Sequence, residues 1–219
     1  MGNSNTVTSN QPGLHKNLDD TVRKHIHSEY KKPIQQHNLL AFEQLQEKIY
    51  NQNFSSLILD SCCGTGKSTM TLAKNNPDSL IIGIDQSFKR LNKQLDDVIQ
   101  PDNCLLLQAN CEDIWRLCDA HNIHFAAHYI LYPNPWPKSV HLGRRWHGHP
   151  VFPYLAKISD KTIVRSNWRL YLEEFQQAWC LLTEQSSEIC PLKINSPLTL
   201  FEKKFAESGQ VLYELIVTL

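Results

Sequence analysis

The sequence predicts a doubly wound α/β fold with a mostly parallel sheet, and three observations support this. Short apolar runs alternate with stretches of helical periodicity from about residue 54 onward. Glycine-containing or polar turns follow the first three apolar runs. The last stretch, 211–219, alternates between polar and apolar side chains and fits an antiparallel terminal strand. Strands that alternate with helices form a parallel sheet covered on both faces.

The expected elements follow in order along the chain. Residues 1–13 are rich in Asn, Ser and Thr, which is typical of a flexible tail. Residues 14–32 are highly charged and fit either a weakly packed helix or an arm that a partner orders, and 34–51 has helical spacing. Strands are expected at 57–59, 80–84, 104–107, 126–131, 162–164 and 211–219, and helices at 68–74, 86–99 and 168–182. We therefore expect a tail and N-terminal helical arm at 1–50 and one α/β domain at 51–219.

Composition restricts the class of protein. The 22 Lys and Arg balance the 22 Asp and Glu, which argues against a general coating of positive charge but allows a local basic patch. The seven Cys are odd in number and lack paired C-x-x-C spacing, so we expect reduced thiols and no metal site. The first ten residues are polar, and no apolar run reaches membrane-spanning length. These features predict a soluble cytoplasmic protein without a membrane partner, as a monomer or homodimer.

Three consecutive strands each end in residues suited to binding a ligand. In open α/β sheets, ligands bind at the carboxyl ends of strands, and a carboxylate about 20 residues beyond the glycine turn can hold a ribose. Asp85 ends the second strand 21 residues after Gly64. We therefore predict an adenosine-containing cofactor. The expected cofactor-binding residues are Asp60, Gly64, Gly66, Asp85, Asn110 and Cys111.

The glycine turn has two other interpretations. Gly66-Lys67-Ser68 resembles the end of a phosphate-binding loop, but that motif requires a glycine where this chain has Ser61. A carboxylate at the end of the strand also suits an ammonium group better than a triphosphate. The remaining alternative is a plain tight turn between strand and helix. The polar cluster that begins at Asn110 can likewise be an ordinary helix N-terminus.

The most specific string follows the fourth strand. Residues 132–138 read Tyr-Pro-Asn-Pro-Trp-Pro-Lys, and three prolines fix a rigid loop there. The next residues, up to 145, contain a His and two Arg. The two pieces together predict a loop that faces the substrate and carries cations for phosphates.

With these residues the chain resembles the bacterial tRNA (guanine-N7)-methyltransferases. In that family the loop reads Phe/Tyr-Pro-Asp-Pro-Trp-Pro-Lys, followed by a basic stretch. Residues 199–202, Thr-Leu-Phe-Glu, match the family's Thr-x-Phe-Glu segment, and 166–168, Ser-Asn-Trp, stand where it has Thr-Asp-Trp. The resemblance covers residues 54–219, with departures from the family pattern at Cys62, Asn110, Asn134 and Asn167.

The resemblance implies a Rossmann-like S-adenosylmethionine-dependent methyltransferase fold, S-adenosyl-L-methionine as cofactor, and tRNA as substrate. It implies methyl transfer to N7 of the variable-loop guanine at position 46, with Asn134 at the catalytic position. Guanine N7 carries an in-plane lone pair, so this transfer needs positioning rather than a base. Glu202 would accept hydrogen bonds from guanine N1 and N2. The residues expected to contact the tRNA are Lys138, His141, Arg144, Arg145, Asn167, Thr199 and Glu202.

Two other functions stay open because Asn134 supplies no charge. An Asn that precedes prolines and an aromatic residue can bind an exocyclic amine, which would suit methylation of another base nitrogen or of a small molecule. The replacement of acids by Asn at 110, 134 and 167 would also fit an RNA-binding protein that keeps the fold without turnover.

Overall fold

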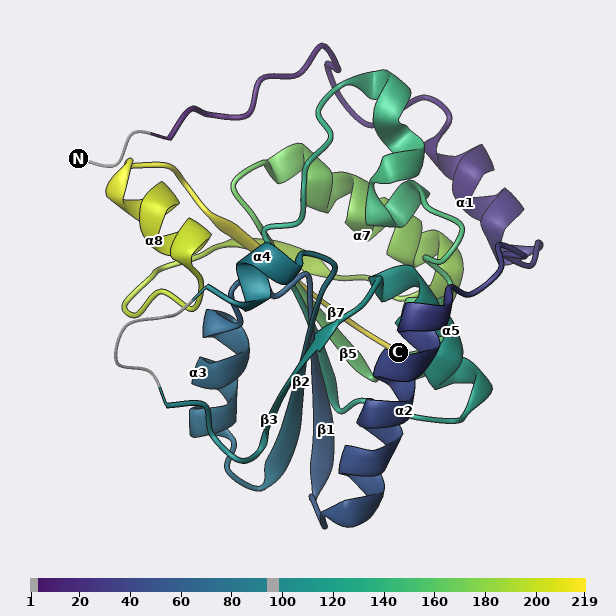
Figure 1. Cartoon of the computed structure of the whole chain (residues 1–219). Coiled ribbons are helices and arrows are strands. Elements are labelled where there is room, and N and C mark those ends of the chain that lie inside the picture. The colour runs from purple at the N-terminus through teal and green to yellow at the C-terminus, as the bar shows by residue number, and fades with distance from the viewer. Residues whose placement is uncertain (1–3, 94–98) are drawn as a thin grey trace.

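The computed structural model describes residues 4–93 and 99–219 and has a seven-stranded sheet in the order β3-β2-β1-β4-β5-β7-β6 (Figure 1). Its parallel part contains β1 (Ser56–Ser61), β2 (Ser79–Asp85), β3 (Cys104–Gln108), β4 (Ala127–Leu131) and β5 (Lys161–Ser166). The antiparallel strands are β7 (Tyr213–Thr218), which pairs with β5, and β6 (Glu188–Pro191) at the edge. The predicted α/β class with an antiparallel terminal strand is confirmed.

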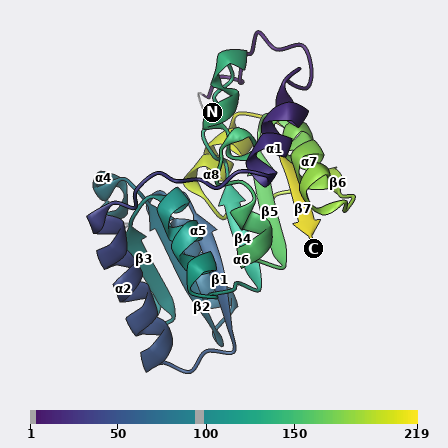
Figure 2. The same cartoon turned by 90° about the vertical axis from the view of Figure 1, so that its right-hand side faces the viewer.

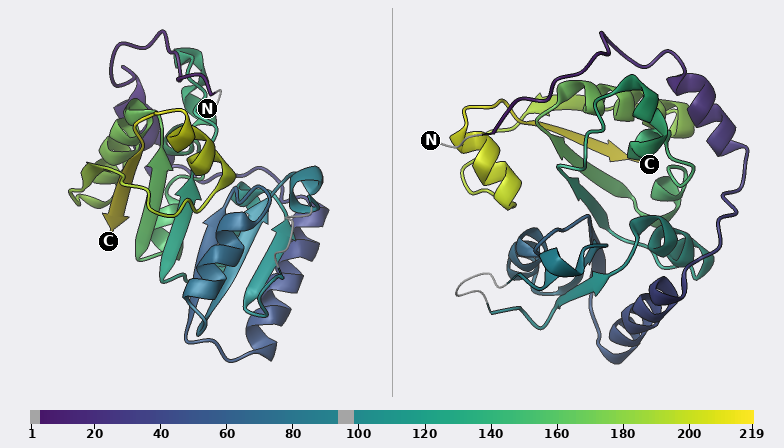
Figure 3. Two further views of the ribbon diagram at one scale, coloured as in Figure 1. Left: turned by 90° about the vertical axis from the view of Figure 1, so that its left-hand side faces the viewer. Right: turned by 45° about the horizontal axis from the view of Figure 1, so that its top comes forward.

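Helices cover both faces of the sheet, so its central strands, such as β2, are buried on both sides. Figure 2 shows α5 (Cys111–Ala120) and α6 (Tyr154–Ile158) in front of one face. The other face is covered by α3 (Lys67–Asn75), seen in the left view of Figure 3. The remaining helices are α1 (Leu18–Ile26), α2 (Gln36–Asn51), α4 (Phe88–Leu91), α7 (Arg169–Thr183), α8 (Leu200–Glu207) and the 3-10 helices η1 (Ser139–Arg144) and η2 (Trp146–Gly148).

The strand register explains the two cores. Successive side chains of a strand point to opposite faces. Ile58 therefore packs with Met70 of α3, whereas the adjacent Leu59 belongs to the larger core on the other face. The strand order changes direction between β1 and β4. From β1 the chain adds β2 and β3 on one side of the sheet, and it then returns to add β4 and β5 on the other side. That switch point is where the carboxyl ends of the strands leave room for a ligand.

Several elements differ from the sequence prediction. The helix expected at 86–99 is the single turn Phe88–Leu91, and residues 94–98 lie outside the described part. Both α8 and β6 were missed, because their apolar positions are few and partly exposed. None of the described helices is long and apolar enough to cross a membrane.

The N-terminal segment packs against the rest of the chain. Leu18 and Val22 of α1 are each 1% exposed, and α1 contacts α7, so this helix is not weakly packed. Upstream of it, the chain runs across the top of the molecule from α8 toward α1 (Figure 1). There Ser9 Oγ donates to the carbonyl of Pro137 at 2.6 Å, and the Ser139 amide donates to Asn10 Oδ1 at 3.2 Å. The segment expected to be a free tail thus contacts the proline loop.

Candidate functional site

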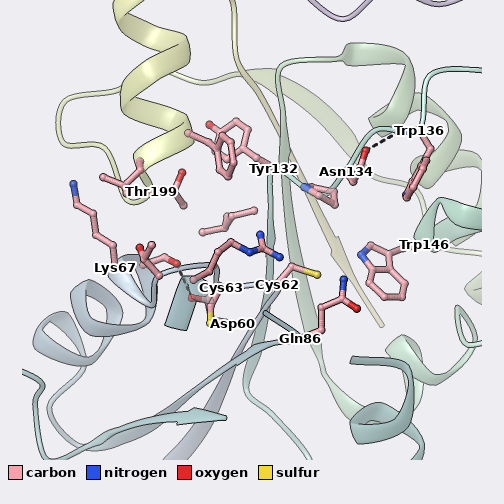
Figure 4. Close-up of a pocket in the computed structure, with 18 of the residues that line it drawn as sticks. Asp60, Cys62, Cys63, Lys67, Gln86, Tyr132, Asn134, Trp136, Trp146 and Thr199 are labelled. Carbon is pink, nitrogen blue, oxygen red and sulfur yellow. Dashed lines mark hydrogen bonds between the residues drawn. The ribbon is translucent and has the colours of Figure 1, made fainter. Parts of the chain in front are cut away.

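A cavity of about 740 Å³ opens at the carboxyl ends of β1, β2 and β4 (Figure 4). The turn after β1, the residues after β2, the proline loop and the start of α8 all contribute to its lining. Two segments that the sequence analysis assigned to different ligands, the glycine turn and the proline loop, therefore share one cavity. The predicted site residues that line it are Asp60, Gly64, Asn134, Arg144 and Thr199.

The glycine turn holds three residues in the left-handed backbone region. Cys62, Gly64 and Gly66 have φ values of 61°, 64° and 75°. A Cβ on Gly64 would meet nothing within 4 Å, so this position is open toward the cavity. A Cβ on Gly66 would lie 2.7 Å from Leu106, because β3 packs against it. Gly64 therefore leaves space for a ligand, whereas Gly66 is required by packing and does not line the cavity.

Asp60 is the last residue but one of β1 and has a fully buried carboxylate. Its Oδ2 accepts hydrogen bonds from Ser68 Oγ at 2.6 Å and Thr69 Oγ1 at 2.7 Å. Its Oδ1 has no hydrogen-bond partner among the described residues. Burial raises the pKa of Asp60 to about 6, against the lowering effect of the two hydroxyl donors. Because a buried polar atom normally has a partner, Oδ1 is available to a cationic or hydrogen-bonding ligand.

Asp85 ends β2 and is 1% exposed at its side chain. Oδ2 accepts from the Gly64 amide at 3.0 Å, and Oδ1 accepts from the Ser87 amide at 2.8 Å. The guanidinium of Arg90 lies 2.9 Å from Oδ1. Asp85, the predicted ribose-binding carboxylate, thus lies beside the glycine turn, but Arg90, rather than Asp85, lines the cavity.

The last two predicted cofactor-binding residues, Asn110 and Cys111, are engaged within the protein. Asn110 Oδ1 lies 3.1 Å from His37 Nε2, and Cys111 Sγ lies 3.9 Å from Cys62 Sγ. Neither residue lines the cavity, whereas Gln86 and Glu112 do. Gln86 directly follows Asp85, and Glu112 directly follows Cys111, so each adjoins a predicted cofactor-binding residue. Their side-chain direction depends on the helix start, which the sequence leaves uncertain.

Two aromatic residues of the proline loop have strained backbone conformations. Tyr132 and Trp136 have φ values of 53° and 45°, in a region that non-glycine residues rarely adopt. Asn134 is exposed in the cavity, and its Oδ1 accepts from the Trp136 amide at 3.4 Å (Figure 4). Such strain persists only where surrounding structure enforces it, and it is concentrated at functional sites.

Trp136 forms the side of the cavity next to Asn134. The guanidinium carbon of Arg144 lies 4.7 Å from the centroid of the Trp136 ring, a cation–π geometry. His141 meets the same ring edge-on, with centroids 5.5 Å apart. Lys138 is exposed just before η1 and, like His141, lies outside the cavity lining. Of the predicted phosphate contacts, Arg144 therefore lines the cavity, and Lys138 and His141 lie beside it.

The structure corrects the prediction that Arg145 contacts the tRNA. Its side chain is fully buried and pairs with Glu174 of α7, which is buried as well. Its Nε also donates to the carbonyl of Trp136 at 3.2 Å. His147 Nε2 lies 2.9 Å from the same Glu174 carboxylate. Arg145 and His147 hold the proline loop against α7 and are not exposed to a phosphate.

Glu202 is also directed into the protein. Its carboxylate accepts from Tyr132 Oη and Arg165 Nη1, each at 2.9 Å, and from the Leu198 amide. With its side chain 1% exposed, it does not face the cavity as the guanine-binding prediction required. Its role in this structure is to connect the loop after β4 with α8.

The two remaining predicted residues are Thr199 and Asn167. Thr199 lines the cavity and caps α8, because its Oγ1 accepts from the Glu202 amide at 2.9 Å. Asn167 Nδ2 donates to Gln210 Oε1 at 2.8 Å and lies outside the lining. Thr199 is therefore available to a ligand, and Asn167 is engaged within the protein.

The cavity is more basic than the whole chain. Its charged lining includes two carboxylates, Asp60 and Glu112. The sequence analysis found one of its cations and missed the others, which come from α3, from α4 and the residues just after it, and from α8 rather than from one basic run. The lining cations are Lys67, Arg90, Lys93, Arg144 and Lys204. Among the described residues, no group of three or more His, Cys, Asp or Glu is arranged to hold a metal ion.

Comparison with solved structures defines the class of fold. The chain superposes on the 16S rRNA methyltransferase KamB with a TM-score of 0.58, at 19% identity, covering 86% of this chain and 96% of that one. It also superposes on a 16S rRNA adenine-N1-methyltransferase from Catenulisporales acidiphilia, solved with its cosubstrate SAM, with a TM-score of 0.57 at 13% identity over 81% and 90% of the two chains. The fold is that of the Rossmann-like S-adenosylmethionine-dependent methyltransferases.

Sequence comparison then gives the family. Residues 54–215 match the family described as "Putative methyltransferase", and the chain belongs to it. Among curated proteins, it is 29% identical to a tRNA (guanine-N(7)-)-methyltransferase of Streptococcus equi subsp. zooepidemicus, over 71% of this chain and 78% of that protein. It is 28% identical to the protein of the same name from Lysinibacillus sphaericus, over 69% and 76%.

Proposed function

We propose that this protein transfers the methyl group of S-adenosylmethionine to N7 of a guanine in tRNA, with the variable-loop guanine as the acceptor. The observation that carries the proposal is a single cavity that joins the unpaired Asp60 Oδ1 and the open Gly64 to the proline loop with Asn134. A donor site and an acceptor site thus adjoin each other. The tRNA (guanine-N7) relatives support the choice of acceptor.

The residues fit the methyl donor. Asp60 Oδ1 is a buried acceptor without a partner and suits the ammonium group of an amino acid. Lys67, at the N-terminus of α3, lines the cavity and suits the carboxylate. Gly64 leaves space for the chain between these groups and the nucleoside. Bound there, S-adenosylmethionine supplies an electrophilic methyl group on a sulfonium.

The acceptor side provides position and charge stabilisation. Guanine N7 needs no base, so the protein's task is to place the lone pair in line with the methyl group. Asn134 offers a carbonyl and an amide NH₂ that can orient a base edge, but it supplies no charge. Positive charge grows on the guanine during transfer. The Trp136 face, which holds Arg144 at 4.7 Å, is suited to attract a cationic ring. We propose that the Trp136 ring stabilises this charge, in place of the carboxylate that the family motif has at the position of Asn134.

The rim suits an RNA backbone. Arg144, Lys93 and Lys204 line the opening from three separate segments, and Lys138 is exposed beside it. Phosphates attract such cations, and this interaction weakens steeply with salt. Because they surround the cavity, these residues would hold the RNA with a base directed inward.

The proposal is tested by incubating the protein with undermodified tRNA and S-adenosylmethionine carrying a labelled methyl group, followed by digestion to nucleosides. We expect label in 7-methylguanosine. Label found only on an exocyclic nitrogen would favour the second candidate, amine methylation, for which the amide of Asn134 is the supporting observation. Tight tRNA binding without any label would indicate a protein that binds RNA without turnover.

A further inference from the structure

Arg90 blocks the carboxylate that the cofactor needs. Asp85 Oδ1 is 2.9 Å from the Arg90 guanidinium and also accepts from the Ser87 amide, while Oδ2 accepts from the Gly64 amide. At the end of the second strand of this fold, a carboxylate binds the ribose hydroxyls of a nucleoside. A carboxylate oxygen has a limited number of acceptor directions. Ribose and Arg90 therefore compete for the carboxylate of Asp85.

The arrangement allows Arg90 to leave at little cost. Its helix, α4, contains four residues, none of them buried, and its cap is the 3.3 Å hydrogen bond from the Arg90 amide to Ser87 Oγ. The Arg90 side chain is 45% exposed, in contrast to its partner. Because Asp85 is buried, its charge needs a hydrogen-bonding partner, and the ribose hydroxyls would replace Arg90 in that role. A ligand that binds Asp85 can thus displace the guanidinium without unfolding the segment.

After displacement from Asp85, the Arg90 side chain can remain in the lining of the cavity. It lines the same cavity as Lys67, Lys93 and Lys204, with Asp60 and Glu112 as the acids in the lining. Once separated from Asp85, its charge adds to this basic rim. A guanidinium binds phosphate in a bidentate manner. An RNA strand at the rim would therefore meet one more available cation when the cofactor is bound than when it is absent.

We propose that Arg90 couples cofactor binding to RNA binding: it pairs with Asp85 until the ribose displaces it, and it then binds an RNA phosphate. This proposal rests on the proposed function and adds a positioning residue to it. The coupling acts in both directions, because the cofactor releases Arg90 to the RNA and RNA bound to Arg90 leaves Asp85 to the cofactor. By thermodynamic linkage, each ligand tightens the binding of the other by the same factor.

The test measures both affinities, each with and without the other ligand. The probes are S-adenosylhomocysteine, which allows no turnover, and undermodified tRNA. In the unaltered protein, saturating S-adenosylhomocysteine should tighten tRNA binding about fivefold or more, and tRNA should tighten S-adenosylhomocysteine binding equally. Arg90→Ala should bind S-adenosylhomocysteine more tightly, because the competitor is gone. Its tRNA affinity should be lower and the same with or without the cofactor product.

Lys204→Ala is the matched control, since Lys204 lines the cavity from α8, on a different segment from Asp85. It should weaken tRNA binding, leave S-adenosylhomocysteine affinity unchanged and keep the coupling. Weaker S-adenosylhomocysteine binding by Arg90→Ala, or coupling retained in that variant, would overturn the proposal. If the unaltered protein forms 7-methylguanosine while Arg90→Ala retains coupling, this inference alone fails. If it binds no S-adenosylhomocysteine, the proposed function fails as well.

Discussion

The two sides of the cavity use buried charge differently. On the β1 side, Asp60 is fully buried yet keeps Oδ1 unpaired among the described residues. On the side of η1, η2 and α7, Glu174 is equally buried, but Arg145 and His147 bond to it. Both are carboxylates without contact to solvent. The unpaired one marks a place for a ligand, and the paired one joins parts of the chain.

Glu174 also secures the N-terminal segment. Gln11 Nε2 and the His15 amide donate to its Oε1, and Gln11 Oε1 accepts from Arg145 at 3.1 Å. The paired side of the cavity is therefore a network of sequence-distant parts: the N-terminal segment, the proline loop and α7. Its electrostatic contribution is to hold the proline loop in place.

The largest expected effect is on stability, at Arg145. Arg145→Ala leaves the buried Glu174 charge without its main partner and should lower the free energy of unfolding by about 3–5 kcal/mol. The adjacent Arg144 is exposed, and Arg144→Ala should change it by less than about 0.5 kcal/mol. Urea unfolding of both variants measures the difference. Equal effects would contradict the distinction between a paired and an available cation.

The next effect is on cofactor affinity, at Asp60. Asp60→Asn keeps the shape of the side chain but removes the charge that faces the ammonium group. It should cost about 1.5–3 kcal/mol of binding free energy for S-adenosylhomocysteine in calorimetry. Asp78→Asn, exposed just before β2 at the opposite edge of the sheet, is the control and should bind normally. Unchanged affinity in Asp60→Asn would place the ammonium group elsewhere.

The two carboxylates should also respond oppositely to pH. Burial raises the pKa of Asp60 to about 6, so its charge is lost as the pH falls through that value. Between pH 7 and pH 5 the ionised fraction falls about tenfold, and S-adenosylhomocysteine affinity should fall by a similar factor. Asp60→Asn should flatten this profile. A profile that keeps its shape in the variant would assign the titration to another group.

The same shift has the opposite sign for folding. The folded state binds the Asp60 proton more tightly than the unfolded chain, whose ordinary pKa is 3.8, so this group stabilises the fold progressively as the pH falls below about 6. Glu174 behaves in reverse. Burial acts to raise its pKa, but hydrogen bonds from His147 and Arg145 lower it to about 2. Its stabilisation is present above about pH 4.5 and is lost as the pH falls toward 2.

A smaller effect is expected at Asn134. If guanine N7 is the acceptor, Asn134→Asp should keep or raise kcat by a few-fold, because a negative charge opposes the positive charge growing on the base. If the acceptor is an exocyclic amine, the same change should lower kcat. Trp136→Leu should lower kcat in the first case, since it removes the aromatic face. The measurement is methyl incorporation into tRNA at saturating cofactor. A fall in Asn134→Asp would exclude the N7 mechanism proposed here.

The smallest effect concerns salt. Each phosphate contact contributes about 0.7–0.9 to the slope of log affinity against log salt concentration. Arg144→Ala should reduce the slope for tRNA binding by about that amount. Arg145→Gln removes the charge of the buried arginine and, in protein that stays folded, should leave the slope unchanged. A reduced slope in Arg145→Gln would mean that the buried arginine reaches the RNA.

The sequence was sufficient for the β1 side of the cavity. Asp60 and Gly64 lie where one strand ends and one helix begins, so local patterns specify them, and the same applies to the mostly parallel sheet with its antiparallel terminal strand. Arg144 and Arg145 could not be distinguished in this way. They have the same chemistry and are adjacent, and the partner of Arg145 is Glu174, 29 residues away on another helix. Burial of one and exposure of the other follow from tertiary packing alone.

The prediction for Glu202 was wrong for a related reason. Motif resemblance placed it at the acceptor, but Arg165 and Tyr132 occupy its carboxylate. These partners lie 37 and 70 residues before it, and its own helix, α8, was not predicted from periodicity. The missed cations of the cavity, such as Lys204, share this origin. They are far apart in the sequence and become one basic rim only in the folded chain.

Methyl transfer to guanine N7 is tested most directly with two tRNA transcripts of the same sequence, one with guanine and one with 7-deazaguanine. The second transcript has a carbon in place of N7 and keeps the exocyclic amine. With labelled S-adenosylmethionine, we expect label to enter the guanine transcript as 7-methylguanosine and none to enter the 7-deazaguanine transcript. Equal labelling of both transcripts would contradict N7 as the acceptor.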